Sequence, residues 1–158
     1  MSDAKQIVRA YLDEVWVNND PEAARRYLHP DFRAHAPGEV LGLDAYIKAI
    51  TRDRLQTDFS LTIHEMIGEG NVVAYRWTED GRHTAPWRGI APTGKPTRIT
   101  GITMNVLQDD LIIAGYFRAN LVGLLEQLGE LPQKVSKRAS GAANLRASVA
   151  ITDFGWGD

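Results

Sequence analysis

The sequence predicts an α+β fold in which N-terminal helices pack on a curved, mixed or antiparallel β-sheet. Three observations predict this class: helical periodicity up to about residue 54, alternation of apolar and polar residues from Phe59 onward, and turn-forming residues between the alternating segments. Runs of helices followed by runs of strands indicate an α+β fold, because interleaved helices and strands would instead predict a parallel sheet. We therefore expect one sheet whose concave face is covered by the helices.

Three helices are expected in the first half of the chain. Residues 3 to about 16 place apolar side chains three and four positions apart, which forms one apolar helix face. Residues 18–21 supply a candidate N-cap followed by a proline at the first helical position, so a second, short helix follows. After an extended piece over residues 32–36 and a turn at residues 37–38, helical spacing resumes from residue 43 to about 54.

Strand-forming segments dominate the second half of the chain. They are rich in β-branched and aromatic residues, and the glycine, asparagine and aspartate residues between them favour tight turns. The expected strands are residues 59–67, 72–78, 99–107 and 111–119, with turns at residues 68–71 and 109–110.

The composition fits a single globular domain. The chain has 158 residues, of which 44% are hydrophobic and 24% charged, so it can bury a sizeable core. Its net charge of -2 provides no basic field to attract nucleic acid, and the absence of cysteine excludes disulfides and thiolate sites. No secretory leader or bilayer-spanning apolar stretch is evident, so we expect a cytoplasmic protein that binds neither nucleic acid nor a membrane.

Two regions are expected, a folded domain over residues 1–129 and a C-terminal extension over residues 130–158. After Gly129 the chain is rich in Ser, Lys, Ala and Gly, which offer little apolar surface to bury. We expect an arm or a partly disordered tail. Its apolar end, around residues 149–156, is a candidate to dock on a sheet edge or over a cavity mouth.

Four short segments, in their order along the chain, resemble a known family. They are Glu-Val-Trp-Val-Asn-Asn-Asp at residues 14–20, Pro-Asp-Phe-Arg-Ala-His at 30–35, Gly-Ile-Ala-Pro-Thr-Gly-Lys at 89–95 and Leu-Leu-Glu-Gln-Leu-Gly at 124–129. Together they resemble the SnoaL-like polyketide cyclases, within the superfamily of the ketosteroid isomerases and the nuclear transport factor. The resemblance covers roughly residues 4–129.

The resemblance implies a cone-shaped α+β barrel, open as a half-barrel around an apolar cavity, with no metal or organic cofactor. Type members of the family close a polyketide ring by aldol condensation, in which a carboxylate takes a proton from a carbon between carbonyl groups. The family places this aspartate seven residues before the glutamine that matches Gln127, and here that position is Asn120. An amide cannot accept the proton at neutral pH, but it can donate to an oxyanion or orient a water molecule.

Three residues are candidates for catalysis: His35, His83 and Asn120. His35 lies where members of the family often carry histidine, and an imidazole could replace the missing base if it faces the cavity. His83 lies between a turn and Trp87 and could reach the cavity mouth. The alternatives are a loop-capping role for His35, a solvent-exposed turn position for His83 and a rim position in water for Asn120.

Aromatic and polarisable side chains are candidates for binding a flat substrate. Alternate side chains of a strand share a face, so we expect Tyr116, Arg118 and Asn120 to point into the cavity, with Phe117 and Ala119 on the opposite face. The alternative for most of the aromatic residues is an ordinary place in the core. No spacing of histidines and carboxylates fits a metal site. The full set of substrate-binding candidates is Tyr11, Trp16, Tyr75, Trp77, Trp87, Met104, Tyr116 and Arg118.

These features lead us to expect a cofactor-free, polyketide-cyclase-like enzyme that uses enolate (aldol-type) acid–base chemistry on an apolar or aromatic natural-product intermediate. Related alternatives are an isomerase, a dehydratase or a cofactor-independent oxygenase. A contrasting one is a protein that binds a small apolar ligand without transforming it, since Asn120 is not a base. We also expect a homodimer or larger homo-oligomer, because residues 72–78 carry apolar groups on both faces of a strand.

Overall fold

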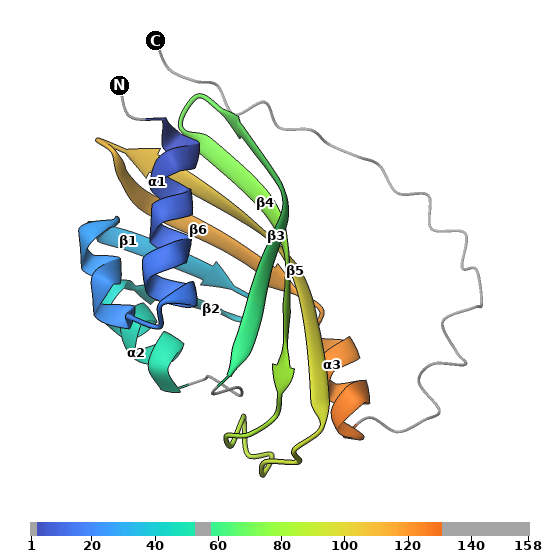
Figure 1. The fold of residues 1–158 in the computed structure, drawn as a ribbon. Coiled ribbons are helices and arrows are strands. Elements are labelled where there is room, and N and C mark those ends of the chain that lie inside the picture. The colour runs from blue at the N-terminus through green and yellow to red at the C-terminus, as the bar shows by residue number, and fades with distance from the viewer. Residues whose placement is uncertain (1–2, 53–57, 131–158) are drawn as a thin grey trace, which may run out of the picture.

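The computed structural model describes residues 3–52 and 58–130 and confirms the α+β class. Six strands form one curved sheet in the order β2-β1-β6-β5-β4-β3, which does not close into a barrel (Figure 1). The sheet is mixed, because β1 and β6 pair in parallel while the other four neighbouring pairs are antiparallel. The strands are β1 (Leu28–Ala36), β2 (Glu39–Gly42), β3 (Phe59–Glu69), β4 (Val72–Arg82), β5 (Pro96–Gln108) and β6 (Leu111–Ala119).

The N-terminal helix forms where helical periodicity predicts it. Helix α1 (Ala4–Tyr11) begins after Asp3, whose carboxylate accepts the backbone N–H of Lys5 at 3.0 Å. A π-helical segment, η1 (Leu12–Val17), continues it. The expected second helix is a 3₁₀-helix, η2 (Pro21–Arg26), capped by the Asp20 side chain, which accepts the N–H of Ala23 at 3.2 Å.

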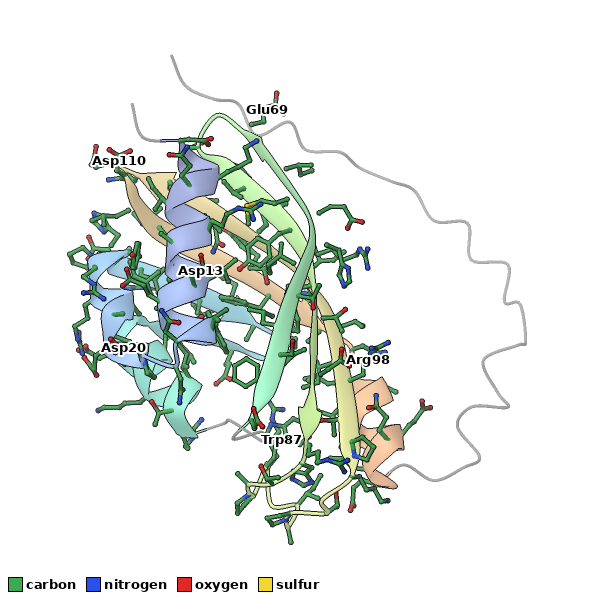
Figure 2. All side chains as sticks on the ribbon, in the orientation of Figure 1. Asp13, Asp20, Glu69, Trp87, Arg98 and Asp110 are labelled. Atoms are coloured by element: carbon green, nitrogen blue, oxygen red, sulfur yellow. The ribbon has the colours of Figure 1, made fainter. Side chains whose placement is uncertain are left out.

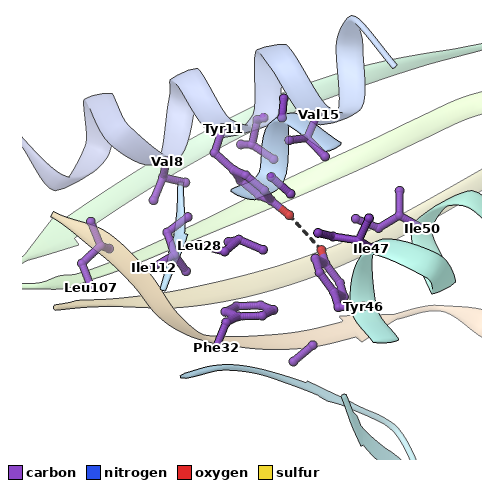
Figure 3. Close-up of a cluster of buried hydrophobic side chains, with 14 of the residues drawn as sticks. Val8, Tyr11, Val15, Leu28, Phe32, Tyr46, Ile47, Ile50, Leu107 and Ile112 are labelled. Carbon is purple, nitrogen blue, oxygen red and sulfur yellow. Dashed lines mark hydrogen bonds between the residues drawn. The ribbon is translucent and has the colours of Figure 1, made fainter. Parts of the chain in front are cut away.

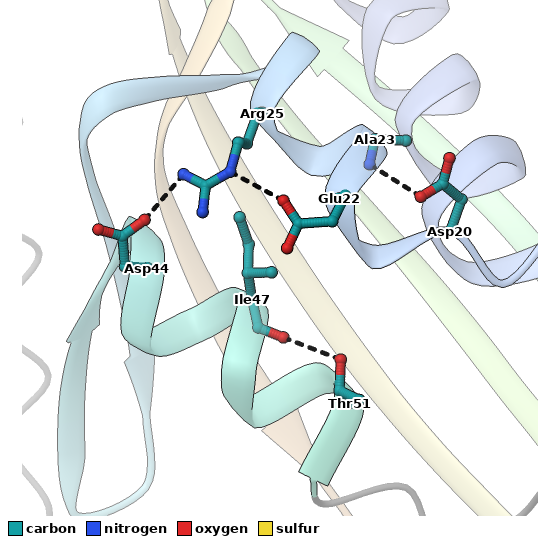
Figure 4. Close-up of polar contacts among 7 residues, drawn as sticks. All are labelled: Asp20, Glu22, Ala23, Arg25, Asp44, Ile47 and Thr51. Carbon is teal, nitrogen blue, oxygen red and sulfur yellow. Dashed lines mark hydrogen bonds and ion pairs between the residues drawn. The ribbon is translucent and has the colours of Figure 1, made fainter.

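Helix α2 (Leu43–Arg52) lies beside η2 and packs on β1. The two helices are also joined by Arg25, whose guanidinium donates to Glu22 at 2.9 Å and to Asp44 at 2.8 Å (Figure 4). All three side chains are largely exposed, so solvent screens this link and it contributes little to stability. It does align the two short helices at one end of the sheet.

Strands β3, β4 and β5 run beyond their expected bounds, and three further elements differ from the sequence-based expectation. Strand β1 starts at Leu28, four residues earlier than expected, because Leu28 pairs with Ile112 of β6. Strand β2 was not expected; it follows Gly38, whose φ of 84° suits the turn that brings it back onto β1. A third α-helix, α3 (Leu121–Leu128), was also not assigned; it packs on β5 and ends at Gly129 in the left-handed conformation.

The main hydrophobic core lies between the helices and the concave face of the sheet (Figure 3). Val8 and Val15 of the first helix are completely buried, as is Ile112 of β6. Two tyrosines meet across this core, with their hydroxyl oxygens 2.8 Å apart: Tyr11 from α1 and Tyr46 from α2. The core therefore contains a buried polar link between the two helices that cover the sheet.

Part of the predicted architecture falls on residues that the structure does not describe. The C-terminal extension lies outside the described residues from position 131 onward, together with its apolar end, and so do the last positions of the expected third helix. Across residues 3–52 and 58–130, every helix is too short or too polar to cross a bilayer.

Candidate functional site

The concave face of the sheet contains a cavity with two adjoining compartments. The inner compartment has a volume of about 80 Å³ and the outer compartment about 270 Å³. Four residues line both: Trp16, Trp77, Glu79 and Phe117. The inner compartment is completed by Leu12, Leu61, Tyr75 and Thr103, and the outer one by Ala34, Ala36, Glu39, Leu41, Tyr46, Ala49, Ile50, Trp87, Ile99, Ala119 and Leu121.

Trp77 forms the wall that the two compartments share. Its indole lies over Gly101 of β5, where a Cβ atom would collide with the ring. Its Nε1–H donates to the hydroxyl of Thr103 at 3.0 Å. Two features therefore fix the position of the Trp77 ring: the space that Gly101 leaves for it, and its hydrogen bond to Thr103.

Trp87 closes the outer compartment from the connection between β4 and β5. Figure 2 shows it at the opposite end of the molecule from Glu69 and Asp110. It is buried in a second, smaller apolar cluster with Ile99 and with Leu124 of α3. Helix α3 therefore supports this side of the cavity.

Buried tyrosines lie in the cavity wall and in the core beside it. Burial raises the pKa of Tyr75, which lines the inner compartment. Burial likewise raises the pKa of Tyr11, and it raises that of Tyr46 well above its usual value. Trp16 donates its Nε1–H to the Tyr11 hydroxyl at 3.2 Å. These phenols stay protonated at neutral pH and can act as hydrogen-bond donors.

Glu79 places a carboxylate in the cavity. It lies on the inward face of β4, beside Leu61 of β3 and Ile99 of β5, and it lines both compartments. Sequence analysis missed it, because the strand was expected to end at residue 78. The alternation that places Tyr75 and Trp77 inward, continued by two residues, would have found it.

The expected orientation of the last strand is wrong. Phe117 and Ala119 line the cavity, whereas Tyr116 is 38% exposed and Arg118 is also exposed. The inward face of β6 is covered by apolar groups of the helices, which favours Phe117 there and leaves the charged Arg118 in water.

His35 lies on the same outward face, so its expected orientation toward the cavity is also wrong. Its ring stacks on Tyr116, with centroids 4.6 Å apart and planes at 11°. The neighbouring positions on β1, Ala34 and Ala36, are the ones that face the cavity. Arg118 Nη1 donates to the backbone oxygen of His35 at 3.3 Å.

Asn120 is the N-cap of helix α3, and it lines neither compartment. Its Oδ1 accepts the backbone N–H of Gly123 at 2.9 Å. This use of an asparagine immediately before a helix satisfies an N–H that would otherwise lack a partner. The structure therefore gives Asn120 a structural hydrogen bond where the sequence suggested a cavity position.

His83 is completely buried, so the solvent-exposed turn position expected as its alternative is wrong. It does not line either compartment. Its Nδ1 accepts the backbone N–H of Thr93 at 3.3 Å and lies 3.1 Å from the Thr93 hydroxyl. In the part of the chain that the structure describes, Nε2 of His83 has no hydrogen-bond partner. The histidine thus braces the connection that carries Trp87.

Two substrate-binding candidates lie elsewhere. Tyr11 belongs to the core, and Met104 is 38% exposed on the convex face of the sheet. Four candidates do line the cavity, namely Trp16, Tyr75, Trp77 and Trp87, and their binding role stays a prediction. Among residues 3–52 and 58–130, no group of three or more His, Asp or Glu side chains is arranged to hold a metal ion.

Comparison with solved structures identifies several similar folds. TsrD of Streptomyces laurentii is 28% identical, with a TM-score of 0.73 over 83% of this chain and 99% of its own. IdmH of Streptomyces antibioticus, a proposed polyketide cyclase, is 24% identical, with a TM-score of 0.69 over 81% of this chain and 99% of its own. AclR of Streptomyces galilaeus, a proposed hydroxylase, is 21% identical, with a TM-score of 0.75 over 87% and 93%.

The sequence itself was compared with curated proteins and with protein families. None of the curated proteins matches it significantly. The SnoaL-like polyketide cyclase family matches residues 5–128, which include every strand described above and every helix except the first residue of α1. The match agrees with the resemblance found in the four sequence segments. The chain is therefore a member of the SnoaL-like polyketide cyclase family.

Proposed function

We propose that this protein is a polyketide-cyclase-like enzyme that needs no cofactor, acts on an aromatic or polycyclic natural-product intermediate, and uses Glu79 as its base. The observation that carries this proposal is the Glu79 carboxylate on the wall of both compartments of an otherwise mainly apolar and aromatic cavity. A carboxylate in such a place can take a proton from a bound substrate, a role for which the sequence had suggested His35, because the amide of Asn120 cannot accept a proton.

The proposed reaction begins at a carbon that lies between two carbonyl groups. Glu79 takes a proton from this carbon; the C–H electron pair forms a carbon–carbon double bond, and the pair of the C=O π bond moves onto oxygen to give an enolate. The enolate carbon then attacks a second carbonyl of the same molecule, which forms the new C–C bond and an alkoxide. The alkoxide takes the proton back from Glu79, so the enzyme is restored.

The cavity contributes mainly position. Trp16, Trp77 and Phe117 offer flat surfaces against which a planar substrate can stack and fold its chain toward the reacting carbon. Membership of the family supports cyclisation as the reaction. The similarity in fold to the proposed hydroxylase AclR is compatible with a different reaction of the same enolate. An isomerase, a dehydratase and a cofactor-independent oxygenase would share the first proton transfer and differ in product.

Turnover of an aromatic β-ketoester substrate by wild type and Glu79→Gln tests the proposal. We expect Glu79→Gln to form product about 10²- to 10⁴-fold more slowly than wild type while it still binds the substrate. Glu69→Gln, in the hairpin at the far end of the molecule, is the matched control and should keep wild-type turnover. Binding without any turnover in the wild-type protein would instead favour the ligand-binding alternative.

We further propose that the convex face of the sheet is the interface of a homodimer. One transverse row of paired residues crosses all six strands, and most of its side chains are apolar. Ile67 is 71% exposed and Val40 58% exposed at its two ends. The row consists of Ile67, Ala74, Met104, Tyr116, His35 and Val40. A second copy related by a two-fold axis would cover it.

Light scattering at micromolar concentration tests this interface. It should give the mass of a dimer or a larger oligomer, and a monomer would contradict this proposal.

A further inference from the structure

We propose that the inner compartment is a size-selective subsite for a short alkyl group of up to about three carbons, carried by an aromatic substrate whose rings occupy the outer compartment. Leu12 and Leu61 set the length limit of this subsite. The inference rests on the proposed function in taking the cavity as the substrate site, and it deepens that function by naming a feature of the substrate. It is carried by the order of the lining residues along the sheet and by the volumes of the two compartments.

The two compartments lie end to end along the strands. On β5, Thr103 lines only the inner compartment and Ile99 only the outer one, about 13 Å further along the strand. The neighbouring strand β4 has the same order, because Tyr75 lines only the inner compartment and Glu79 lines both. Register pairing places Tyr75 beside Thr103 and Glu79 beside Ile99. Since four residues line both compartments, one elongated ligand can extend from the outer compartment into the inner one.

The inner compartment exists because a small side chain lies between two large ones. Thr103 pairs in register with Tyr75 of β4 and with Phe117 of β6, and all three line the compartment. The threonine is much shorter than its two aromatic neighbours, so a hollow remains over it. Its hydroxyl accepts the N–H of Trp77 at 3.0 Å. An apolar group in the hollow therefore leaves this hydroxyl with its partner.

The volumes of the compartments determine what each can hold. An apolar cavity of about 150 Å³ holds one benzene molecule, which corresponds to about 25 Å³ per carbon atom. On this scale the inner compartment, at about 80 Å³, holds about three carbons and excludes an aromatic ring. The outer compartment, at about 270 Å³, has room for a naphthalene ring system, which needs about 250 Å³. A bicyclic aromatic compound with one short alkyl group therefore fits with only the alkyl group inside.

Two leucines from different elements limit the inner compartment. Leu12 comes from η1 and Leu61 from β3, and neither lines the outer compartment. Leu12 is buried in the main core, whereas Leu61 is half-buried at its margin. Truncation of Leu61 to alanine removes three carbons and adds about 75 Å³ on the same scale. Leu61→Ala therefore enlarges the inner compartment alone, with less damage to the core than Leu12→Ala.

Calorimetric titration of wild type with 6-alkyl-2-naphthols, with chains from methyl to pentyl, tests the length limit. Each methylene that enters an apolar site should tighten binding about four-fold, so affinity should rise about 15-fold from methyl to propyl. Butyl and pentyl should bind no more tightly than propyl, because a fourth carbon meets the wall of the compartment.

Variants of Leu61 test whether this residue sets the limit. In Leu61→Ala, affinity should continue to rise from propyl to pentyl. Leu61→Val removes one carbon and should move the limit to butyl, which keeps the test available where Leu61→Ala does not fold. Leu41→Ala is the matched control, because Leu41 is also half-buried but lines only the outer compartment. Its limit should stay at propyl.

A second pair of probes tests the apolar character of the inner compartment. 6-Propyl-2-naphthol and 6-(2-hydroxyethyl)-2-naphthol have side chains of the same size, which end in a carbon and in an oxygen. Wild type should bind the propyl compound at least about ten-fold more tightly, because the hydroxyl loses its hydrogen bonds to water. Equal or tighter binding of the hydroxyethyl compound would identify a polar subsite and overturn the inference.

The outcomes separate this inference from the proposed function, because they measure binding, whereas the base is tested by turnover. A steady rise in wild-type affinity up to pentyl, or no dependence on chain length, overturns the inference even where Glu79→Gln abolishes turnover. A limit that stays at propyl in folded Leu61→Ala overturns it as well. If the limit moves with Leu61 while Glu79→Gln turns over substrate at the wild-type rate, the subsite stands and the proposed function fails.

Discussion

Trp77 lies against Gly101, its register partner on the neighbouring strand, at a distance that leaves no room for even one methyl group. This contact fixes the indole along the wall shared by the two compartments of the cavity. The shape of the candidate site therefore depends on the absence of a side chain at one position of β5.

Gly101→Ala should displace the Trp77 indole and weaken both stability and binding. Overpacking of this kind costs about 1 to 3 kcal/mol, and the moved ring would fill part of the cavity. Urea unfolding measures the first effect and titration with 2-methylnaphthalene the second. Thr100→Ala, an exposed position next to it on the same strand, is the control. Unchanged affinity in Gly101→Ala would show that Trp77 does not shape the binding site.

The hydrogen bond between Tyr11 and Tyr46 should stabilise the core by about 1 kcal/mol. Tyr11→Phe and Tyr46→Phe should each lower the free energy of unfolding by this order. The double variant should lose less than the sum of the two, because both changes remove the same bond. Exposed Tyr116→Phe provides the comparison. Fully additive losses would mean that the two hydroxyls do not stabilise the fold through each other.

Stability should fall as the pH rises above about 10, the usual pKa of a tyrosine. Burial raises the pKa of Tyr46 in the folded protein, so the unfolded chain loses this proton first and binds fewer protons than the folded one. Below about pH 10 this effect leaves the free energy of unfolding unchanged. Above that pH, each tyrosine with a raised pKa lowers the free energy of unfolding by about 1.4 kcal/mol per pH unit. Urea unfolding at several pH values should show a shallower decline for Tyr46→Phe than for wild type. If stability declined equally steeply with pH in Tyr46→Phe and in wild type, the pKa of Tyr46 would not be raised in the folded protein.

Asn120 should behave as a helix cap. Asn120→Ala should cost about 1 kcal/mol of stability, whereas Asn120→Asp should keep it, since aspartate is an equally good cap. The aspartate matches the base expected from the family pattern, so cyclisation assays of Asn120→Asp are informative. We expect no gain in rate, because the side chain is held by Gly123 outside both compartments. A large gain would show that this position still reaches the substrate.

Met104→Lys should weaken the proposed dimer. The change places one charge near the centre of the apolar row, and a two-fold axis brings a second like charge close to it. Light scattering over a dilution series should show dissociation at a higher concentration than in wild type. Gln108→Lys, at the exposed end of β5, is the control. Equal association of both variants would exclude the row around Met104 from the interface.

The elements of the fold were largely predictable, because their signals are local. Strand β6 has the bounds that its composition and the preceding turn predicted, α1 begins one residue after the predicted start at residue 3, and η2 begins at the proline of the predicted cap segment, residues 18–21. The start of β1 and the whole of β2 depend on pairing between distant segments, such as Leu28 with Ile112, which no local pattern encodes.

The site was less predictable than the fold, for reasons that particular residues illustrate. A register shift between Ile63 and Glu65 of β3 allows Met66 to pack on the core, although simple alternation from Ile63 would place it on the other face. On β6 the ring of Phe117 stacks on Tyr46 at 5.7 Å, a contact made by a helix from another part of the chain. Which face of a strand is covered is decided by such tertiary contacts, so the polar face was mistaken for the cavity face.

The most direct test of the central claim is exchange of the α-proton of an aromatic β-ketoester in deuterated water, followed by NMR. This measures the proton transfer itself and does not depend on which product is formed. The account predicts that wild type and Glu69→Gln accelerate loss of the α-proton signal, and that Glu79→Gln reduces the acceleration by about 100-fold or more. Exchange catalysed equally well by Glu79→Gln and wild type would contradict the assignment of Glu79 as the base.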